Sequence, residues 1–292
     1  IIYGTQSMKR LQPVKIHGME MKDRTEKSGC LLCGYKRHKV IHKFKSLPAS
    51  RRGKQKLDIV KCSNRERGLV ASHPPVPNDH WADKYAGDYW RDYQTSIGER
   101  RIDERFEEFE MISAERIQYL GSFYRLRPPG RGVKTTGRFL DVGWSMGFLG
   151  KAAEQAGFKN AYGIDPNQQD IDEGRERYGV SIEKRAIEKY GENSFDVIMC
   201  FNTIEHVPRP ELLVEEMVKR LAPKGCLVLG THDIECENYI NEGVKWKHIK
   251  PAEHLYYFSK DTLSQLCERY GLRAFWNAKP IENSIVTYFI RG

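Results

Sequence analysis

Strand-like and helix-like segments alternate regularly from residue 138 to the end of the chain. The first unit begins with RFLDVG, a short apolar run typical of a buried strand. GFLGKAAEQAG follows, in which apolar residues have helical spacing and the last glycine marks the end of the helix. The same change of period predicts strands at 138–143, 160–166, 195–201, 225–232 and 284–292, and helices at 147–157, 167–179, 210–222 and 259–271. This alternation indicates an α/β fold with a mainly parallel sheet and helices on both faces. Ligands of such sheets bind at the carboxyl ends of the strands.

Two further regions precede this alternation. Residues 1–75 hold 11 Lys and 7 Arg against 5 acids, a net charge of +13, which leaves −4 for the rest of the total +9. A proline-rich linker follows, and then a helix is expected over 84–124, because apolar residues recur there every three to four positions. We therefore expect a basic module (1–75), a linker with a helical cap (76–133) and a main domain (134–292). The basic module suits either an anionic partner or a solvated arm.

Hydropathy and cysteine content indicate the cellular compartment in which the protein is expected. No apolar run approaches the roughly 20 residues needed to cross a bilayer, and no short apolar segment follows a basic one at the start of the sequence. The seven cysteines are an odd number spread along the chain, which favours a reducing compartment over a disulfide framework. We therefore expect a cytoplasmic protein that does not span a membrane. Four cysteines in or beside apolar runs are expected to pack as small apolar side chains: Cys200, Cys226, Cys236 and Cys267.

The turn DVGWSMGFLG after the first predicted strand is the first candidate ligand site. Its glycines read G-x-x-x-G-x-x-G, which differs from the G-x-G-x-x-G spacing of dinucleotide-binding turns. Asp141 would attract a cationic group, and bulky Trp144 and Met146 are expected to leave less room for a diphosphate. The turn therefore suits a ligand that carries an amino group.

Three motifs in the same order carry a family resemblance. They are DVGWSMG, YGIDP with Asp165 placed 24 residues after Asp141, and FDVIMCFNTIEHVPRPELLVEEMVKRLAPKGCLVLG. Together with EHLYYFSKDTLSQLCERYGL, they resemble class I S-adenosylmethionine-dependent methyltransferases of the small-molecule type, related to ubiquinone-biosynthesis O-methyltransferases. The resemblance covers roughly residues 134–292 and implies a Rossmann-like class I methyltransferase domain that binds S-adenosylmethionine.

The resemblance also implies roles for single residues. The cofactor would be held by Asp141, Gly143, Ser145 and Gly147 around its methionine part, by Asp165 at the ribose, by Ile187 and Glu188 near the adenine, and by Asn202 at the end of the fourth-strand motif. His206 is the candidate general base, because an imidazole titrates near neutral pH. The alternative is that Glu205 and His206 only shape the turn between strand and helix. His254, Tyr256 and Tyr257 would line the acceptor pocket, with core packing as their alternative role.

The remaining cysteines belong to the basic module. CLLCG followed by KCSNRERG resembles part of the N-terminal zinc ribbon of some sugar and natural-product C-methyltransferases, which implies Cys30, Cys33 and Cys62 as zinc ligands. Arg65 stands where that pattern has its fourth cysteine. Because structural zinc takes four ligands, either a histidine (His38, His42 or His73) completes the site or the metal has been lost.

These patterns leave three classes of function. The first is an S-adenosylmethionine-dependent methyltransferase acting on a small-molecule acceptor, such as a sugar nucleotide or a polyketide-like metabolite, that is anionic or carrier-linked. The second is an RNA methyltransferase that uses the basic module, although CFNTIEH lacks the proline-rich motif of amino-methylating nucleic-acid enzymes. The third is a non-catalytic binding protein with the same fold. The sequence leaves open whether O, N or C is methylated.

Overall fold

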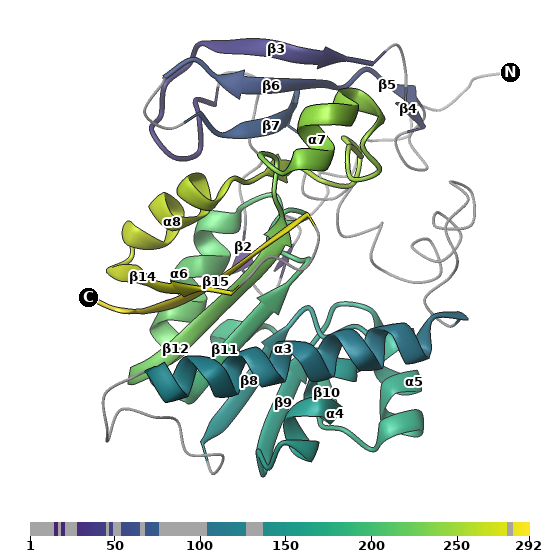
Figure 1. The fold of residues 1–292 in the computed structure, drawn as a ribbon, viewed down its shortest axis with the longest axis vertical. Helices are drawn as coiled ribbons and strands as arrows, with labels where there is room; N and C mark the ends of the chain where they lie inside the picture. The colour runs from purple at the N-terminus through teal and green to yellow at the C-terminus, as the bar shows by residue number, and fades with distance from the viewer. Residues whose placement is uncertain are drawn as a thin grey trace, which may run out of the picture.

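The computed structural model describes residues 15–16, 19–20, 28–44, 47–48, 54–64, 68–75, 104–126, 137–278 and 283–292. A seven-stranded sheet with helices at its sides confirms the predicted Rossmann-like α/β fold (Figure 1). Its strands lie in the order β10 (Ile182–Glu183), β9 (Asn160–Ile164), β8 (Arg138–Val142), β11 (Phe195–Phe201), β12 (Leu221–His232), β15 (Ser284–Arg291) and β14 (Leu272–Asn277). Neighbours from β10 to β12 are parallel, whereas β15 is antiparallel to both β12 and β14.

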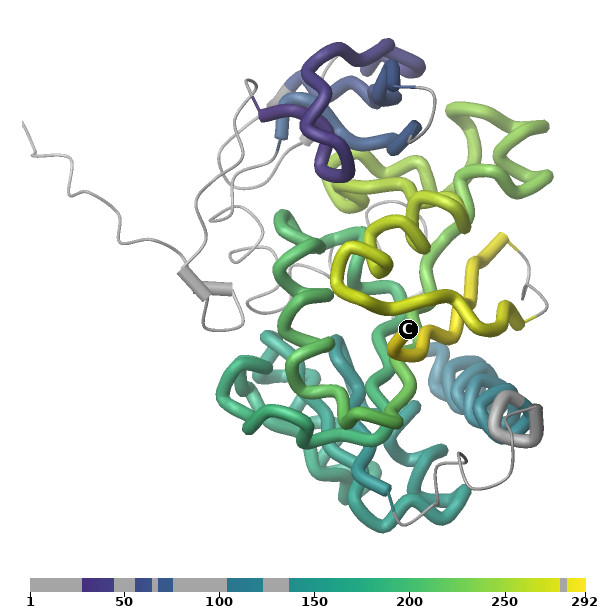
Figure 2. Tube along the Cα trace, turned by 90° about the vertical axis from the view of Figure 1, so that its left-hand side faces the viewer, coloured from purple at the N-terminus to yellow at the C-terminus, as the bar shows by residue number. Residues whose placement is uncertain are grey.

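Helices cover both faces of this sheet because alternate side chains of each strand point to opposite sides. Leu140 and Ile198 pack with residues of α6 (Pro210–Arg220) and α8 (Lys260–Glu268) in one apolar cluster. Their strand neighbours, Phe139 and Val197, pack with α3 (Phe106–Leu126) and α4 (Phe148–Gln155) in a second cluster. Figure 2 shows α3 lying to one side of the strands. The strands are therefore apolar on both faces, as expected for a buried parallel sheet.

Several boundaries differ from the sequence prediction. Helix α6 ends at Arg220, and β12 starts at Leu221 and runs through Pro223, because Leu221 already pairs with Phe195 of β11 across a bulge. Strand β14 and helix α7 (Glu237–Glu242) were not predicted. The helix expected over 84–124 is described from Phe106, and residues 76–103 lie outside the described part of the chain. The remaining elements of this region are α5 (Gln168–Tyr178), η2 (Ile187–Lys189) and η3 (Gly243–Lys245).

A smaller sheet joins the N-terminal region to the main domain. Its order is β13 (Tyr256–Tyr257), β7 (Val70–His73), β6 (Asp58–Cys62) and β3 (His38–Lys43), and it lies at the top of Figure 1. The main domain contributes β13, which is antiparallel to β7, and Arg269 Nη1 donates to the backbone oxygen of Leu31 at 2.8 Å. The short ribbons β1 (Lys15–Ile16) with β2 (Met19–Glu20), and β4 (Leu47–Pro48) with β5 (Lys54–Gln55), form separate pairs. The boundary at residue 75 stays a prediction.

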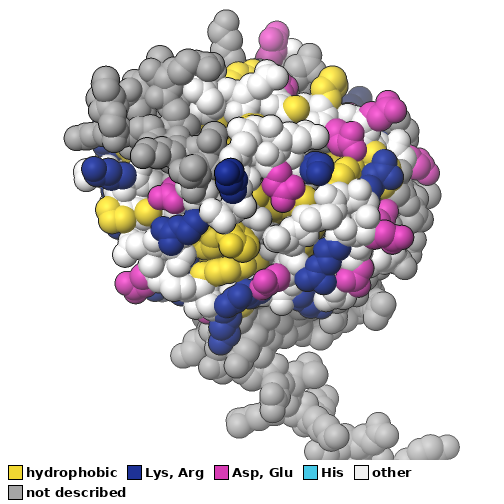
Figure 3. Space-filling model, turned by 90° about the horizontal axis from the view of Figure 1, so that it is seen from below, with side chains coloured by type: hydrophobic (Ala, Val, Ile, Leu, Met, Phe, Trp, Pro, Cys, Tyr) yellow, Lys and Arg dark blue, Asp and Glu magenta, His cyan; other side chains and the backbone are white. Residues whose placement is uncertain are grey.

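The surface of the described residues carries charges of both signs. Seen from below, the described surface carries acidic and basic side chains side by side, with apolar ones between them (Figure 3). This mixed face contrasts with the net charge of +13 counted for residues 1–75. None of the helices in the described ranges combines the length and apolar character that crossing a membrane requires.

The four cysteines expected to pack as apolar side chains differ in burial. Cys200, Cys226 and Cys267 are buried, and none of the seven cysteines, all of which lie in the described ranges, forms a disulfide. Cys236 is half-buried, and its sulfur accepts a hydrogen bond from the backbone nitrogen of Tyr239 at 3.4 Å, which caps α7.

Candidate active site

The turn between β8 and α4 is built on glycine. Gly143 has a φ of +81°, and a Cβ there would lie 2.0 Å from Thr203 Oγ1. Gly143 and Trp144 donate their backbone N–H groups to the carbonyl oxygen of Ile164, at 2.9 and 3.1 Å. Gly147, with a φ of +88°, is the N-cap of α4. The backbone of this turn is therefore held against the end of β9, and only glycine fits at its first position.

The indole of Trp144 packs into the core. A Cβ on Gly150 would lie 1.6 Å from the ring, and a Cβ on Gly163 would lie 1.8 Å from it. Trp144 and Met146 are only 3% and 0% exposed. The Trp144 ring fills the space between α4 and β9 and also contributes to the lining of the cavity described below, whereas Met146 packs with Phe148. The expectation that these two side chains leave less room for a diphosphate stays a prediction.

Two carboxyl groups stand at the carboxyl ends of neighbouring strands. Burial raises the pKa of Asp141 to about 7, the guanidinium of Arg116 opposes that shift, and the charge of Asp165 adds to it. Burial also raises the pKa of Asp165 to about 7. Asp165 accepts backbone hydrogen bonds from Ser145 and from Asn167, both at 2.8 Å. Each of its oxygens keeps a second lone pair, so Asp165 can hold the turn and still accept from a ligand hydroxyl.

A cavity of about 640 Å³ opens beside this turn. Six of the residues predicted for the site line it: Asp141, Gly143, Ser145, Asn202, His206 and His254. Gly147 and Asp165 do not line it, although Asp165 is bonded directly to Ser145. The sheet thus brings most of the predicted residues from three separate motifs to one place, at the strand ends where α/β sheets bind ligands.

Three further predicted residues, besides Gly147 and Asp165, lie outside the cavity lining. Ile187 is fully buried in the apolar core. Glu188 follows it in η2, and burial raises the pKa of its carboxyl group. Tyr257 is buried in β13, where it packs with Ile59 of the smaller sheet, and its ring lies 6.1 Å from that of His254. Their assigned roles stay predictions.

Four histidines that line the cavity, His206, His232, His248 and His254, have neighbouring rings, and only His206 and His254 were predicted. His232 ends β12, and its ring is stacked 3.5 Å from that of His248. Burial, aided by the charge of Lys250, lowers the pKa of His232 to about 3. Burial and its histidine neighbours hold the pKa of His254 well below its usual range. Both imidazoles are therefore neutral at neutral pH. The position of His232 at the carboxyl end of a predicted strand was the signal that sequence reasoning overlooked.

Two hydrogen bonds fix the rings of the predicted histidines. Nδ1 of His206 donates to the carbonyl oxygen of Glu253 at 3.0 Å, and Nδ1 of His254 donates to that of His248 at 2.8 Å. Because a carbonyl can only accept, Nδ1 carries a hydrogen in both rings, and in the neutral form of each ring the lone pair is on Nε2. The Nε2 atom of His206 lies 4.0 Å from Glu205 Oε1.

Helix α3 contributes a cation that sequence reasoning missed. The guanidinium of Arg116 lies 4.1 Å from the centre of the Phe201 ring. Burial lowers the pKa of Arg116 to about 10, and the charges of Asp141 and Glu205 partly counter that effect. The expected cap helix therefore supplies a positive charge to the cavity.

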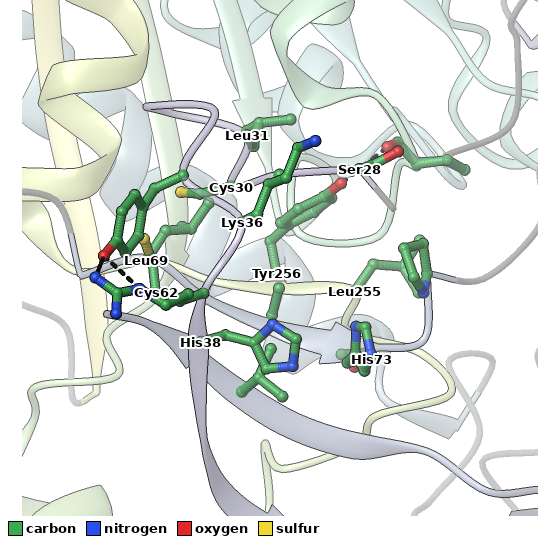
Figure 4. Close-up of a pocket in the computed structure, with 18 residues that line it drawn as sticks. Ser28, Cys30, Leu31, Lys36, His38, Cys62, Leu69, His73, Leu255 and Tyr256 are labelled. Atoms are coloured by element: carbon green, nitrogen blue, oxygen red, sulfur yellow. Dashed lines mark hydrogen bonds between the residues drawn. The ribbon is translucent and has the colours of Figure 1, made fainter. Parts of the chain in front are cut away.

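The three N-terminal cysteines lie close together, and two of them, Cys30 and Cys62, line a separate pocket of about 80 Å³ (Figure 4). Cys33 Sγ and Cys62 Sγ are 3.7 Å apart, and burial raises the pKa of Cys30 to about 12. Two candidate fourth ligands, His38 and His73, line the same pocket. The three sulfur atoms lie within 4.8 Å of one another, but no histidine nitrogen among the described residues lies that close to all three. Nε2 of His42 instead lies 3.0 Å from the hydroxyl of Tyr239, and Arg65 is outside the described residues.

A parallel sheet whose first strand ends in a glycine turn, with a second acid after the next strand, defines a Rossmann-like ligand-binding domain. Residues 112–275 match a family model described as a methyltransferase domain. Since this match spans more than half of the chain, the protein belongs to the methyltransferase domain family.

Individual relatives agree with this assignment. A ubiquinone biosynthesis O-methyltransferase of Actinobacillus pleuropneumoniae serotype 7 is 35% identical over 106 residues, which is 32% of this chain and 45% of the relative. One from Neisseria meningitidis serogroup A is 28% identical over 159 residues, 46% of this chain and 63% of the relative. The chain thus spans about half the length of the curated relatives it matches.

The fold also has counterparts among solved structures. Magnesium protoporphyrin IX methyltransferase from Synechocystis PCC 6803, solved with bound SAH, superposes with a TM-score of 0.50 at 14% identity. The superposition covers 70% of this chain and 98% of that one, which supports the class I methyltransferase fold.

Proposed function

We propose that this protein is an S-adenosylmethionine-dependent methyltransferase that acts on a small-molecule acceptor. The observation that carries the proposal is a glycine turn beside a cavity of about 640 Å³, with the buried carboxyl group of Asp141 in the cavity lining and the half-buried Asp165 bonded to the turn. Ligand pockets typically enclose about 300–1,000 Å³, so this space suits a nucleoside cofactor together with an acceptor. We place its activity in the cytoplasm, as its seven free thiols suggest.

The residues of the turn would hold the cofactor by complementary charge and hydrogen bonding. Asp141 would pair with the amino group of the methionine part, beside the backbone of Gly143 and Ser145. Asp165 would accept from the ribose hydroxyls through its remaining lone pairs. Asn202 lines the same cavity at the end of β11, and Ile187 and Glu188 retain the adenine role that the resemblance implies.

The cofactor supplies a methyl group already activated on a sulfonium. The protein then has to orient the acceptor in line with that methyl and keep water out, so positioning is the largest contribution. His206 is the candidate general base, because it lines the cavity and its Nδ1 donates to Glu253, which places the lone pair of the neutral ring on Nε2.

The charges around the cavity support an anionic acceptor. Arg105, Arg116, Lys247 and Lys250 all contribute to its lining, and Asp141 and Glu108 are the acids there. The curated relatives are named as O-methyltransferases, so we propose an oxygen atom as the acceptor. RNA methylation through the basic module remains the second candidate, and it predicts salt-sensitive binding to generic RNA.

Calorimetric titration of S-adenosylmethionine tests the proposal. The wild-type protein should bind it saturably, and Asp165→Ala should bind it at least tenfold more weakly, since a hydrogen bond to a charged group contributes about 1.5–3 kcal/mol. Asp172→Ala serves as the control, because that carboxylate is 62% exposed on α5. Absence of binding to folded wild-type protein would favour the non-catalytic class instead.

The cysteine cluster supports a structural zinc ion in the basic module. Four thiolates at about 2.3 Å from a tetrahedral zinc would lie roughly 3.8 Å apart, and Cys33 and Cys62 are separated by 3.7 Å. Metal analysis of freshly purified protein should find zinc, and Cys33→Ser should lower its content. Less than about a tenth of an equivalent in the wild-type protein would contradict a structural zinc site.

A further inference from the structure

Three metal-ligating side chains from distant parts of the chain meet in the cavity. Glu205 follows β11, His232 ends β12, and His254 precedes β13. One ligand atom from each of them lies within 4.8 Å of the other two. Metal bonds of about 2.1 Å place neighbouring ligand atoms roughly 3–4 Å apart. The three side chains therefore need to move together by only about 1 Å or less to share one ion.

The carboxyl group of Glu205 is buried, with the hydroxyl of Thr231 and the imidazole of His206 as its polar neighbours. The side chain is 2% exposed, and neither of its oxygens makes a hydrogen bond of standard geometry within the described part of the chain. Its backbone oxygen instead accepts from Leu255 and Tyr256, at 2.8 and 3.2 Å, and so anchors the loop before β13. Burying a carboxyl group without a well-formed hydrogen bond is costly, which favours a ligand role for Glu205 over a turn-forming one.

The two imidazoles are arranged as metal ligands usually are. Nδ1 of His254 donates to the carbonyl of His248, which orients the ring and leaves the Nε2 lone pair for a ligand. His232 is held by stacking at 3.5 Å on the ring of His248, and its buried Nδ1 has no hydrogen-bond partner among the described residues.

We propose that Glu205, His232 and His254 bind a divalent transition-metal ion of the zinc class. Two imidazole nitrogens and one carboxylate oxygen are a donor set of catalytic zinc sites, in which a further coordination position stays open. Here that position would face the cavity, because His232 and His254 both line it. The site is separate from the cysteine cluster of the basic module.

The role of the ion rests on the proposed function. An acceptor hydroxyl bound at the open position would lose its proton more readily, as water does on zinc. His206, whose Nε2 is 4.0 Å from Glu205, would take that proton. The acceptor oxygen would then form a bond to the methyl carbon while the carbon–sulfur bond breaks. The electron pair of that bond stays on sulfur, so the products are the methyl ether and S-adenosylhomocysteine.

Zinc counting tests the site independently of catalysis. Protein stripped with a chelator is dialysed against micromolar Zn²⁺, and bound zinc is measured by mass spectrometry. Glu205→Gln and His232→Asn should each hold one equivalent less than the wild type. Glu235→Gln, a matched change at an exposed residue beyond β12, should hold as much as the wild type. Equal zinc in all four proteins would refute the site.

Two further measurements separate the possible failures. Circular dichroism establishes that each variant is folded, and His232→Asn supplies the result if the more buried Glu205→Gln does not fold. S-adenosylmethionine titration of the same proteins reports on the proposed function alone. If the variants hold as much zinc as the wild type and all proteins bind the cofactor, only the metal site is refuted. If the variants lose zinc but the folded wild-type protein binds no cofactor, only the methyltransferase function is refuted.

Discussion

The affinity for the cofactor should depend on pH through Asp141. Burial raises the pKa of this carboxyl group to about 7, and the charges that face it are Arg116 from α3 and Asp165 from the end of β9. The proposed contact with the cofactor ammonium requires the ionised form. Binding should therefore weaken as the pH falls through about 7, although the ligand itself keeps its charge.

The size of the effect follows from the pKa. With a pKa of about 7, roughly three quarters of Asp141 is ionised near pH 7.5 and about 3% near pH 5.5, so Kd should rise about 25-fold, or about 2 kcal/mol. His232 and His248, with pKa values lowered to about 3 and about 2, stay neutral over this range. Any titration of Asp165, whose pKa is also about 7, acts in the same direction.

Calorimetry with S-adenosylhomocysteine, which lacks the labile sulfonium, is the appropriate assay. Near pH 6, binding should release protons, which is detected by repeating the titration in buffers of different ionisation enthalpy. Asp141→Asn should bind weakly at every pH and lose most of the dependence. A Kd that stays constant between about pH 5.5 and 7.5 would refute the assignment of Asp141 to the ammonium.

The stability of the ligand-free protein should change with pH in the opposite sense. The pKa values of Asp141, Asp165 and Glu205 are each raised to about 7, so the folded state binds protons that the unfolded state releases from about pH 4 upward. Their contribution to stability is fully present below about pH 4 and is lost as the pH rises through about 7. Chemical denaturation between about pH 5 and 8 measures it, and a rise in unfolding free energy over that range would contradict these pKa shifts.

Three substitutions test other parts of the structure. Gly163→Ala would place a Cβ 1.8 Å from the Trp144 ring, so it should lower the free energy of unfolding by about 1–3 kcal/mol or more; Gly121→Ala, where a Cβ meets nothing within 4 Å, is the control. Ser259→Ala removes the capping box of α8 and should cost about 1 kcal/mol in the same denaturation assay. His206→Ala should lower kcat about a hundredfold or more with cofactor affinity nearly unchanged; a parallel loss of affinity would argue against a base.

Local sequence patterns located most elements of the main domain, although not β14 or α7. The strand over 195–201 was predicted to the residue, and Ser259 was identified as the cap of α8. Apolar periodicity and capping chemistry act within a few residues, so they can be read without knowing what packs on the segment. The glycine turn at Gly143 and the acid at Asp165 were located for the same reason, because each directly follows a recognisable strand.

Contacts between distant residues were decided only by the tertiary structure. Trp144 turns into the core because Gly150 and Gly163 leave room for its ring, a fit that spacing along the chain does not reveal. Arg116 reaches the cavity from a helix that was expected only to cover the domain.

The histidines of the cavity also show which features the sequence determines and which depend on the tertiary structure. His232 and His254 are 22 positions apart and belong to different elements, yet the carboxyl edge of the sheet and the loop before β13 bring them to one cavity with Glu205. The sequence determined which segments become strands and helices, because that depends on local spacing. The tertiary structure decided which side chains meet, because the order of strands in the sheet and the path of the loops set those distances.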